Sequence, residues 1–222
     1  MRLRTGIGAA VIGAAACTAP LLTATPSSAA TSSAEVSVVH GIPNTPVDVY
    51  VDGHRVLHDF TFGTVAGPLS LRPGTHTVRV RPDDAPDTSK PILSTTVRLH
   101  SGENATLAAD LTASGSPSLT AFVNPTSAVA AGKARVIVRH VAAAPGVDVY
   151  AGSAKVITDL TNPHQAVLVT AAGDVPVHVN VTGTTTTVIG PANLDFKSGT
   201  TTIVYAIGSV AGKTLTVAVQ SY

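Results

Sequence analysis

Hydrophobic and polar residues alternate along most of the chain after residue 35. In the segment 47–52 the odd positions hold valine and the even positions hold Asp, Tyr and Asp, and in the segment 175–181 every odd position is valine. A period of two puts successive side chains on opposite faces of an extended strand, whereas an amphipathic helix repeats about every 3.6 residues. The pattern therefore predicts an all-β protein with half-buried strands.

Turn signals separate the alternating segments. Asp52-Gly53 lies between two of them, and both residue types tolerate the positive φ of a two-residue hairpin turn. The equivalent place in the second half holds Gly152-Ser153, and segment 71–74 supplies a further Pro-Gly turn. About seven short strands in each half predict an immunoglobulin-like antiparallel β-sandwich, with a small β-barrel as the alternative fold.

The pattern of the first half recurs one hundred residues later. Segments 38–60 and 138–160 align without a gap, with identical residues at Val38/Val138, His40/His140, Val47/Val147, Asp48/Asp148, Val49/Val149, Tyr50/Tyr150, Val56/Val156 and Asp59/Asp159. Two copies of this length match ordinary domain sizes and exceed the repeat of a solenoid. We expect a first domain over 35–124, a linker over 125–133 and a second domain over 134–222.

The N-terminal 30 residues have the pattern of a secretory signal peptide. Arg2 and Arg4 precede an apolar segment from Gly6 to Leu22, and Ser28 and Ala30 supply the small residues required before a cleavage site. We expect cleavage near Ala30 and a secreted, extracellular protein that can associate with the cell surface. The run is interrupted by proline and is too weakly apolar for a good membrane anchor, so the mature chain should have no transmembrane segment.

Cys17 offers a second processing route. Cleavage before this cysteine with lipid attachment is the alternative to cleavage near Ala30, although Ala14 stands where lipoprotein signals usually carry a larger aliphatic residue. Cys17 is the sole cysteine, so removal of residues 1–30 would leave a mature chain without a thiol or a disulfide.

Composition narrows the classes of partner. The chain has 14 basic and 13 acidic residues and no basic run, which argues against a nucleic-acid partner. Aromatic residues make up 4% of the chain and Trp is absent, which disfavours stacking platforms of the kind that many sugar-binding grooves use. An extracellular protein or a cell-wall component is the expected partner, of unknown identity.

Several of these segments resemble a known family. Val38-Val39-His40, Pro43 and the stretch 47–53, followed by segments 62–64 and 71–76, resemble Domain of Unknown Function 4397. The resemblance covers almost the whole mature chain as two tandem copies, although the second copy departs from it at Ala143 and at Gly152-Ser153. It implies exported or surface-located bacterial proteins with immunoglobulin-like sandwiches, and it supplies no activity or catalytic residue set.

The repeated His–Asp pairs are the first candidates for chemistry. His40 with Asp48, and His140 with Asp148, keep the same spacing in both copies. Such a pair could ligate a metal or exchange a proton if the side chains converge. The alternation instead favours a core-side histidine bonded to backbone and an aspartate that closes the proline-containing turn.

Two further candidate sites are weaker. Tyr50 and Tyr150 could anchor a partner, or they could simply pack over the hairpin. Asp83, Asp84 and Asp87 lie in the loop Pro82–Pro91, where carboxylates could hold calcium or form a solvated loop that proline stiffens.

Known catalytic and cofactor motifs do not occur in the sequence. The chain contains no G-x-S-x-G, no H-E-x-x-H and no phosphate-binding glycine loop, and we expect no cofactor and no catalytic residues. The leading hypothesis is a secreted, non-enzymatic module for extracellular or cell-envelope binding, with Gly41–Pro46 and Pro82–Pro91 as contact loops. A carbohydrate- or metal-binding accessory domain is the alternative, and an uncharacterised hydrolase ranks third.

Overall fold

The computed structural model describes residues 32–86 and 88–222, and the predicted signal peptide lies outside the described residues. Every regular element among the described residues is a β-strand, and these residues belong to one compact unit. The strands form four sheets of four strands each. The predicted fold of two tandem β-sandwiches is therefore confirmed, and the β-barrel alternative is wrong.

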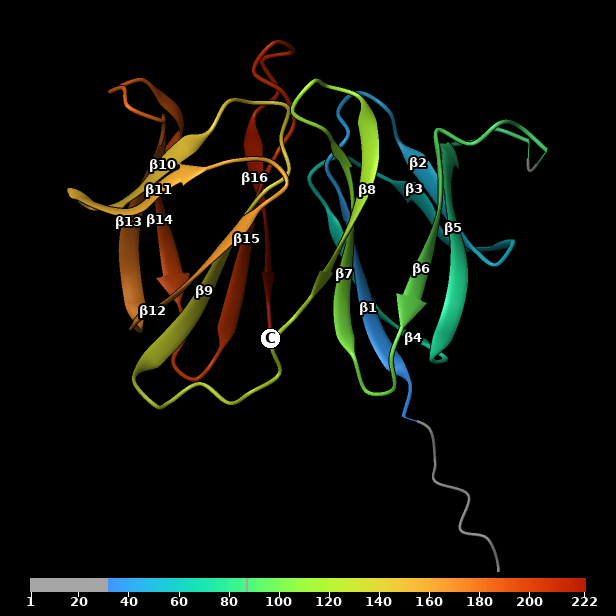
Figure 1. Ribbon diagram of the computed structural model, residues 1–222, viewed down its shortest axis with the longest axis horizontal. Coiled ribbons are helices and arrows are strands. Elements are labelled where there is room, and N and C mark those ends of the chain that lie inside the picture. Colours follow the sequence, from blue (N-terminus) through green and yellow to red (C-terminus); the bar gives the residue numbers. More distant parts are fainter. Residues whose placement is uncertain (1–31, 87) are drawn as a thin grey trace, which may run out of the picture. The chain divides into compact units, whose positions relative to one another are not determined.

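The first eight strands form one sandwich (Figure 1). One of its sheets has the order β4-β1-β7-β8 and the other the order β3-β2-β5-β6. Neighbouring strands are antiparallel except β1 and β7, which are parallel. The strand bounds are β1 (Ala34–His40), β2 (Val47–Val51), β3 (His54–Phe60), β4 (Val65–Leu71), β5 (Gly74–Pro82), β6 (Leu93–Leu99), β7 (Asn104–Leu111) and β8 (Pro117–Val123).

The last eight strands repeat this topology. The sheets β12-β9-β15-β16 and β11-β10-β13-β14 have the same strand order as those of the first sandwich, and β9 and β15 again pair in parallel. The strand bounds are β9 (Lys133–His140), β10 (Val147–Ala151), β11 (Ala154–Leu160), β12 (Gln165–Ala171), β13 (Gly173–Val181), β14 (Thr187–Phe196), β15 (Thr201–Ile207) and β16 (Thr216–Ser221).

Each sandwich thus has eight strands, where the sequence pattern predicted about seven. Strands such as β4 are difficult to recognise because proline cannot donate to the ladder and is unfavourable inside most strands. Pro68 is accommodated because β4 is an edge strand, and its pairing with β1 shifts register between Val36 and Val38.

Alternation places the apolar face of each strand in a core. In the first sandwich, Val36, Val47, Val49, Val80 and Leu107 are nearly inaccessible to solvent and belong to one cluster between the two sheets. The hydrophobic effect of burying this surface holds the sheets together in a protein without a disulfide among its described residues.

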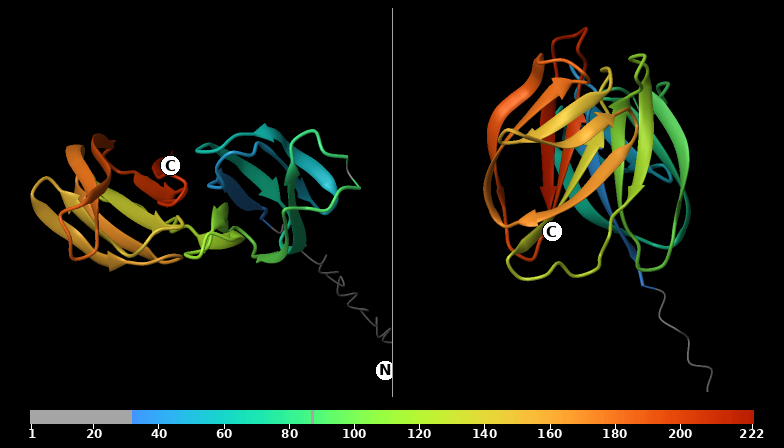
Figure 2. Two further views of the ribbon diagram at one scale, coloured as in Figure 1. Left: turned by 90° about the horizontal axis from the view of Figure 1, so that it is seen from above. Right: turned by 60° about the vertical axis from the view of Figure 1, so that its left-hand side comes forward.

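The two sandwiches contact each other through their central sheets. The outer faces of β4-β1-β7-β8 and β12-β9-β15-β16 contribute to a single buried cluster that includes Val39, Ala108, Ile137, Ile203 and Ile207. Figure 2 shows the chain passing once from the first sandwich to the second, through the segment between β8 and β9. The middle strands β1, β7, β9 and β15 are therefore buried on both faces.

Arg139 of β9 is buried in this contact and has no solvent exposure. Its guanidinium donates hydrogen bonds to Gln165, Tyr205 and Asn124 at 2.9, 2.9 and 2.8 Å, and it lies 4.2 Å from the ring centroid of Phe122. Phe122 lies in β8 of the first sandwich and Asn124 follows that strand, so Arg139 interacts across the contact between the sandwiches. Burial lowers the pKa of Arg139.

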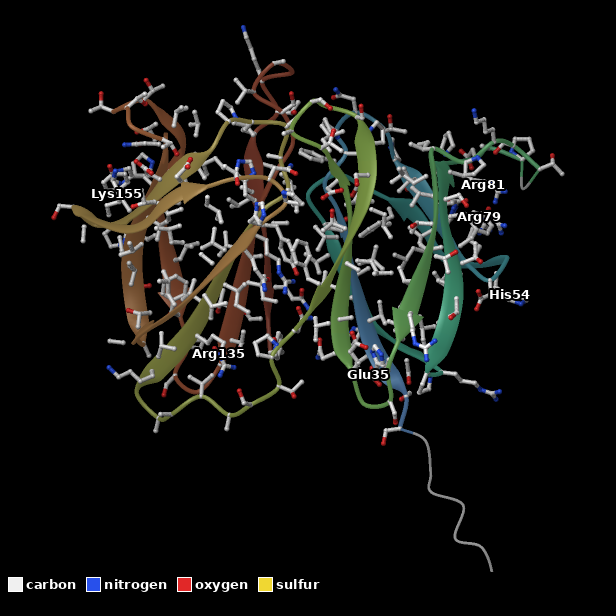
Figure 3. All side chains as sticks on the ribbon, in the orientation of Figure 1. Glu35, His54, Arg79, Arg81, Arg135 and Lys155 are labelled. Atoms are coloured by element: carbon white, nitrogen blue, oxygen red, sulfur yellow. The ribbon has the colours of Figure 1, made fainter. Side chains whose placement is uncertain are left out.

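Several charged side chains lie on the outer sheets. Figure 3 shows Arg79 and Arg81 on β5 and Lys155 on β11, away from the central sheets. No helix in the described part of the chain is long and apolar enough to cross a membrane.

Candidate functional site

Asp48 and Asp148 are buried carboxylates at equivalent places in β2 and β10, with only 2% and 1% of their side chains exposed. In both copies, the register between the hairpin strands shifts beside the aspartate. The shift leaves Asp59 and Asp159 with positive φ values of 49° and 52°. Oδ1 of Asp48 accepts the N–H of Asp59 at 3.2 Å, and Oδ1 of Asp148 accepts that of Asp159 at 3.0 Å.

The repeated aspartate therefore stabilises a β-bulge. A displaced N–H group that is buried without an acceptor would cost free energy, and the carboxylate supplies that acceptor. The sequence pattern predicted that the aspartate closes the proline-containing turn. The prediction is wrong, because the carboxylates of Asp48 and Asp148 bond to the neighbouring hairpin strand. The bulge could not be read from the alternation.

A basic side chain holds the second oxygen of each aspartate. Arg55 Nη1 lies 3.0 Å from Oδ2 of Asp48, and Lys155 Nζ lies 2.6 Å from Oδ2 of Asp148. In the second copy the hydrogen bonds from Lys155 and the Asp159 N–H lower the pKa of Asp148 to about 2. In the first copy burial acts to raise the pKa of Asp48, but hydrogen bonds from His58, Arg55 and the Asp59 N–H outweigh it and the pKa is lowered.

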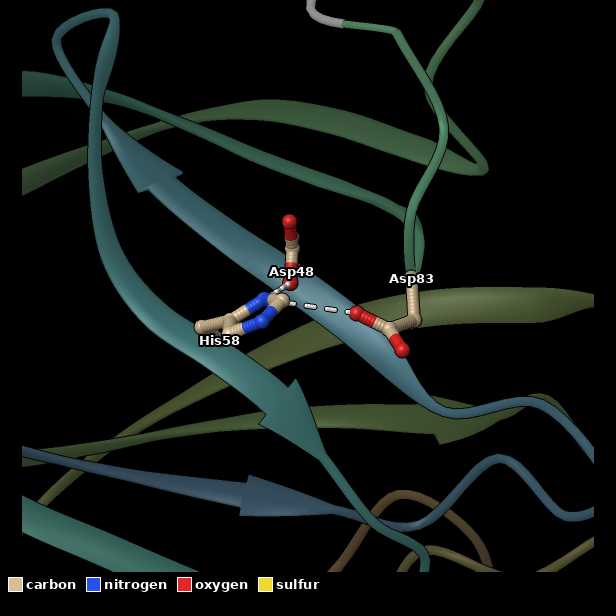
Figure 4. A group of neighbouring side chains, drawn as sticks. All are labelled: Asp48, His58 and Asp83. Carbon is tan, nitrogen blue, oxygen red and sulfur yellow. Dashed lines mark hydrogen bonds and ion pairs between the residues drawn. The ribbon is translucent and has the colours of Figure 1, made fainter.

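The first copy adds two groups that the second lacks (Figure 4). His58 Nδ1 lies 2.8 Å from Asp48 Oδ1 and 3.4 Å from Asp83 Oδ1. The second copy has Thr158 in place of His58, and Gly183 N–H bonds to Asp148 in the region of the missing carboxylate, at 3.3 Å. The copies thus share the aspartate and differ in what surrounds it.

The Asp48–His58–Asp83 cluster is charged and partly accessible. The hydrogen bond to Asp48 raises the pKa of His58. Burial and then the neighbouring charges of Asp84 and Asp59 raise the pKa of Asp83, whose Oδ1 has no hydrogen-bond partner. One imidazole nitrogen and two carboxylate oxygens within 4.8 Å of one another are a donor set that divalent metals accept.

The structure separates the predicted His–Asp pairs. His40 has no solvent exposure, its Nε2 lies 2.8 Å from the carbonyl oxygen of Thr45, and Ile42 N–H points to its Nδ1. His140 Nε2 lies 2.9 Å from the carbonyl oxygen of Pro145 in the same way. Burial lowers the pKa of both histidines. The two histidines therefore bond to the loops that follow β1 and β9, and these bonds do not involve Asp48 or Asp148.

The tyrosines occupy different environments in the two copies. Tyr50 is 3% exposed, and the guanidinium carbon of Arg81 lies over its ring, 4.9 Å from the ring centroid of Tyr50. Tyr150 is partly exposed and stacks on His178 with ring centroids 4.7 Å apart. A role for either tyrosine in binding stays a prediction.

The predicted acidic loop is only partly brought together. Asp83 joins the cluster with His58, whereas Asp84 is exposed and affects Asp83 through its charge. Asp87 lies outside the described residues. A calcium site formed by these three aspartates stays a prediction.

His58 is the residue that sequence reasoning missed. It resembles any polar side chain on a strand, and its partners Asp48 and Asp83 belong to other strands. The Asp52-Gly53 turn pairs Val51 with His54. If the strands continued to pair without interruption from there, residue 57 would lie opposite Asp48. The observed register shifts bring residues 58 and 59 to the aspartate instead.

Comparison with known families agrees with the fold. The model of the family described as "Domain of unknown function (DUF4397)" matches residues 34–150, more than half of the 222-residue chain. The chain therefore belongs to this family. The match covers the first sandwich and continues through β9 into β10. A search of curated proteins finds no match.

Proposed function

We propose that this chain is an exported, non-enzymatic β-sandwich protein that acts as an extracellular or cell-envelope binding module. The observation that carries the proposal is that the polar residues shared by the two copies bond to the backbone. His40, His140, Asp48 and Asp148 all bond to backbone groups that the fold would otherwise leave without partners. These residues therefore support the fold, and differences between the copies provide the basis for binding.

The second sandwich is proposed as a second copy of the family domain. Its strand order, its histidine–carbonyl bond and its aspartate-stabilised bulge repeat those of the first sandwich. Gene duplication followed by divergence of the loops would give one framework two binding surfaces. Each sandwich would then bind through groups that the other lacks.

Export is proposed from the N-terminal pattern. We expect the protein recovered from the culture medium or the cell surface to begin at Thr31, which N-terminal sequencing or intact-mass measurement would show. A mature chain that begins at a lipid-modified Cys17 would replace the secreted form with an anchored one. Retention of the full 222 residues in the cytoplasm would contradict export.

The loop Pro82–Pro91 is the better exposed of the two predicted contact loops. Gly41 and Ile42 are buried, and the carbonyl of Gly41 accepts the N–H of Gly208 at 3.3 Å, so only the tip of Gly41–Pro46 is accessible. In contrast, Asp84, Pro86 and Thr88 are exposed. A partner would therefore reach the Pro82–Pro91 loop first.

Loop exchange tests the proposed binding role. Residues 83–90 would be replaced by the shorter turn Gly183–Thr186 of the second copy, and sedimentation with insoluble cell-wall material and with extracellular proteins would be measured. We expect the native chain to be retained and the exchanged chain to lose retention, with unchanged circular dichroism. Absence of retention for the native chain, or equal retention of both folded chains, would contradict the proposal.

A second candidate function is divalent-metal binding by the first sandwich, carried by the Asp48–His58–Asp83 geometry. Because protons compete for the imidazole, binding of Zn²⁺ should strengthen as pH rises above the pKa of His58. Calorimetric titration with Zn²⁺ and with Ca²⁺ would measure it. Asp83→Asn and His58→Gln should abolish binding, whereas His54→Gln, on an exposed residue outside the cluster, should preserve it. Equal heats for all these variants would exclude this site.

A further inference from the structure

The second sandwich contains an apolar cavity of about 230 Å³ between its two sheets. Residues of all four edge strands line it, namely Val156 of β11, Leu168 of β12, Ile189 of β14 and Val217 of β16. Valines of the central strands complete the walls, among them Val136, Val138, Val149, Val179 and Val204. The cavity thus occupies the place of a hydrophobic core.

The first sandwich shows how the same fold closes this space. Pairing along the ladders identifies equivalent inward positions in the two copies. Four of them hold a smaller or less apolar residue in the second: Val204 for Leu107, Val217 for Leu119, Thr170 for Leu71 and Ala151 for Val51. Each change removes hydrocarbon from the space between the sheets.

Solvent reaches the second interior as a result. Val78 and Val97 of the first sandwich are 2% and 9% exposed, whereas their counterparts Val177 and Leu194 are partly exposed. Leu194 is larger than Val97 and Phe196 is larger than its counterpart Leu99, but this added volume does not close the cavity.

The lining determines which ligands can enter. Inward-facing side chains are hydrocarbon apart from the Thr170 hydroxyl, and Tyr150 and His178, which also border the cavity, stack on each other. A sugar or a charged group inside would lose its hydrogen bonds to water without replacement. A closed apolar cavity of roughly 150 Å³ accommodates benzene, so this larger open one has room for several linked methylene groups.

We propose that the cavity of the second sandwich binds an aliphatic hydrocarbon chain, such as the alkyl chain of a fatty acid or lipid, with its polar end at the opening. The chain would occupy the volume that leucines fill in the first sandwich. This site is separate from the Pro82–Pro91 loop and does not depend on the binding role proposed for that loop.

Titration of residues 31–222 with cis-parinaric acid, followed by displacement with dodecanoic acid, tests the proposal. We expect saturable fluorescence with one site per chain. The double variant Val204→Leu/Val217→Leu restores the residues of the first sandwich, so it should bind at least tenfold more weakly and melt at a higher temperature. Val167→Leu makes the same change on a side chain that is 52% exposed and outside the lining, and it should bind as the native chain does.

If the double variant misfolds, a second variant that fills the cavity and a direct measurement of where the ligand lies still test the proposal. Ala151→Val should also weaken binding, and dodecanoic acid should shift the methyl resonances of Val138 and Val204. The proposal is overturned if the intact chain shows no saturable binding, if a folded filled variant binds with native affinity, or if naphthalene binds and dodecanoic acid does not.

Discussion

At the scale of single residues, burial determines what the polar side chains do. Burial lowers the pKa of His40 and His140 and outweighs the opposite effect of the bond from each Nε2 to a loop carbonyl. The alternation of β1 and β9 was sufficient to place them on the core side, because residue parity assigns a face. Their carbonyl partners could not be predicted, because they depend on the path of a loop.

The lowered pKa of His140 gives a pH-dependent contribution to stability. The neutral ring stabilises the fold above the ordinary histidine pKa of about 6.5, and this contribution is lost as pH falls through the lower pKa of the folded state. At pH 7.5, His140→Gln should cost about 1–3 kcal/mol because the Pro145 carbonyl loses its donor. Urea denaturation from pH 7.5 to 5 should show this cost shrinking. A cost that grows as pH falls would contradict a neutral histidine.

Asp110 should have the opposite pH dependence. It is 1% exposed, accepts a bond from Thr120 at 2.8 Å, and has a second oxygen without a partner. Burial raises its pKa to about 6, so its contribution to stability is full below the ordinary aspartate pKa and is lost as pH rises through about 6. Asp110→Asn should therefore stabilise the fold by about 2 kcal/mol at pH 8 and have little effect at pH 4. Destabilisation at pH 8 in thermal melts would show that the charge has an unrecognised partner.

At the scale of elements, the β2–β3 hairpin shows where sequence reasoning succeeds and where it stops. Its turn was predictable because Asp-Gly favours positive φ, and Asp52 and Gly53 have φ values of 51° and 86°. The second copy uses Gly152, at 61°, for the same purpose. The bulges that follow have no sequence signal of this kind, because they depend on how the two hairpin strands pair and on the buried aspartate. Consequently the Asp48–His58 contact could not be predicted.

The two turns provide a matched pair of substitutions. Gly53→Ala places a side chain at positive φ, where L-residues are strained, and should cost about 1 kcal/mol although the surrounding space is open. Ser153 occupies the equivalent place in the second turn without positive φ, so Ser153→Ala should have little effect. Denaturant midpoints of the two variants would measure the difference. Equal losses would show that the turn conformations do not differ as described.

At the scale of the whole described unit, the sequence predicted two sandwiches but not which of their faces meet. Strand β9 has buried residues on both faces, and its alternation cannot reveal that a second sheet covers the outer face. Arg139 is the clearest case, because an arginine on an outer face is normally exposed. It is buried here because Asn124, Gln165 and Tyr205 accept its hydrogen bonds.

Loss of Arg139 should therefore weaken the junction between the sandwiches. Arg139→Ala should reduce the free energy of unfolding by about 3 kcal/mol or more, because the buried Asn124 and Tyr205 lose a charged donor and the contact loses a large buried side chain. Arg139→Lys should recover only part of this loss, because an ammonium cannot reproduce the planar set of donors. Calorimetry should change from one cooperative transition to two in the alanine variant. A single unchanged transition would contradict a stabilising junction.

The repeated aspartates Asp48 and Asp148 support the framework that the two sandwiches share. Asp48→Ala and Asp148→Ala would be compared with the native chain by denaturation at pH 7 and at low pH. Both variants should be less stable at pH 7, and the Asp148 difference should fade as pH falls through about 2, where its carboxylate becomes protonated. The claim is contradicted if either substitution leaves the stability at pH 7 unchanged or raises it, as replacement of a strained functional residue often does.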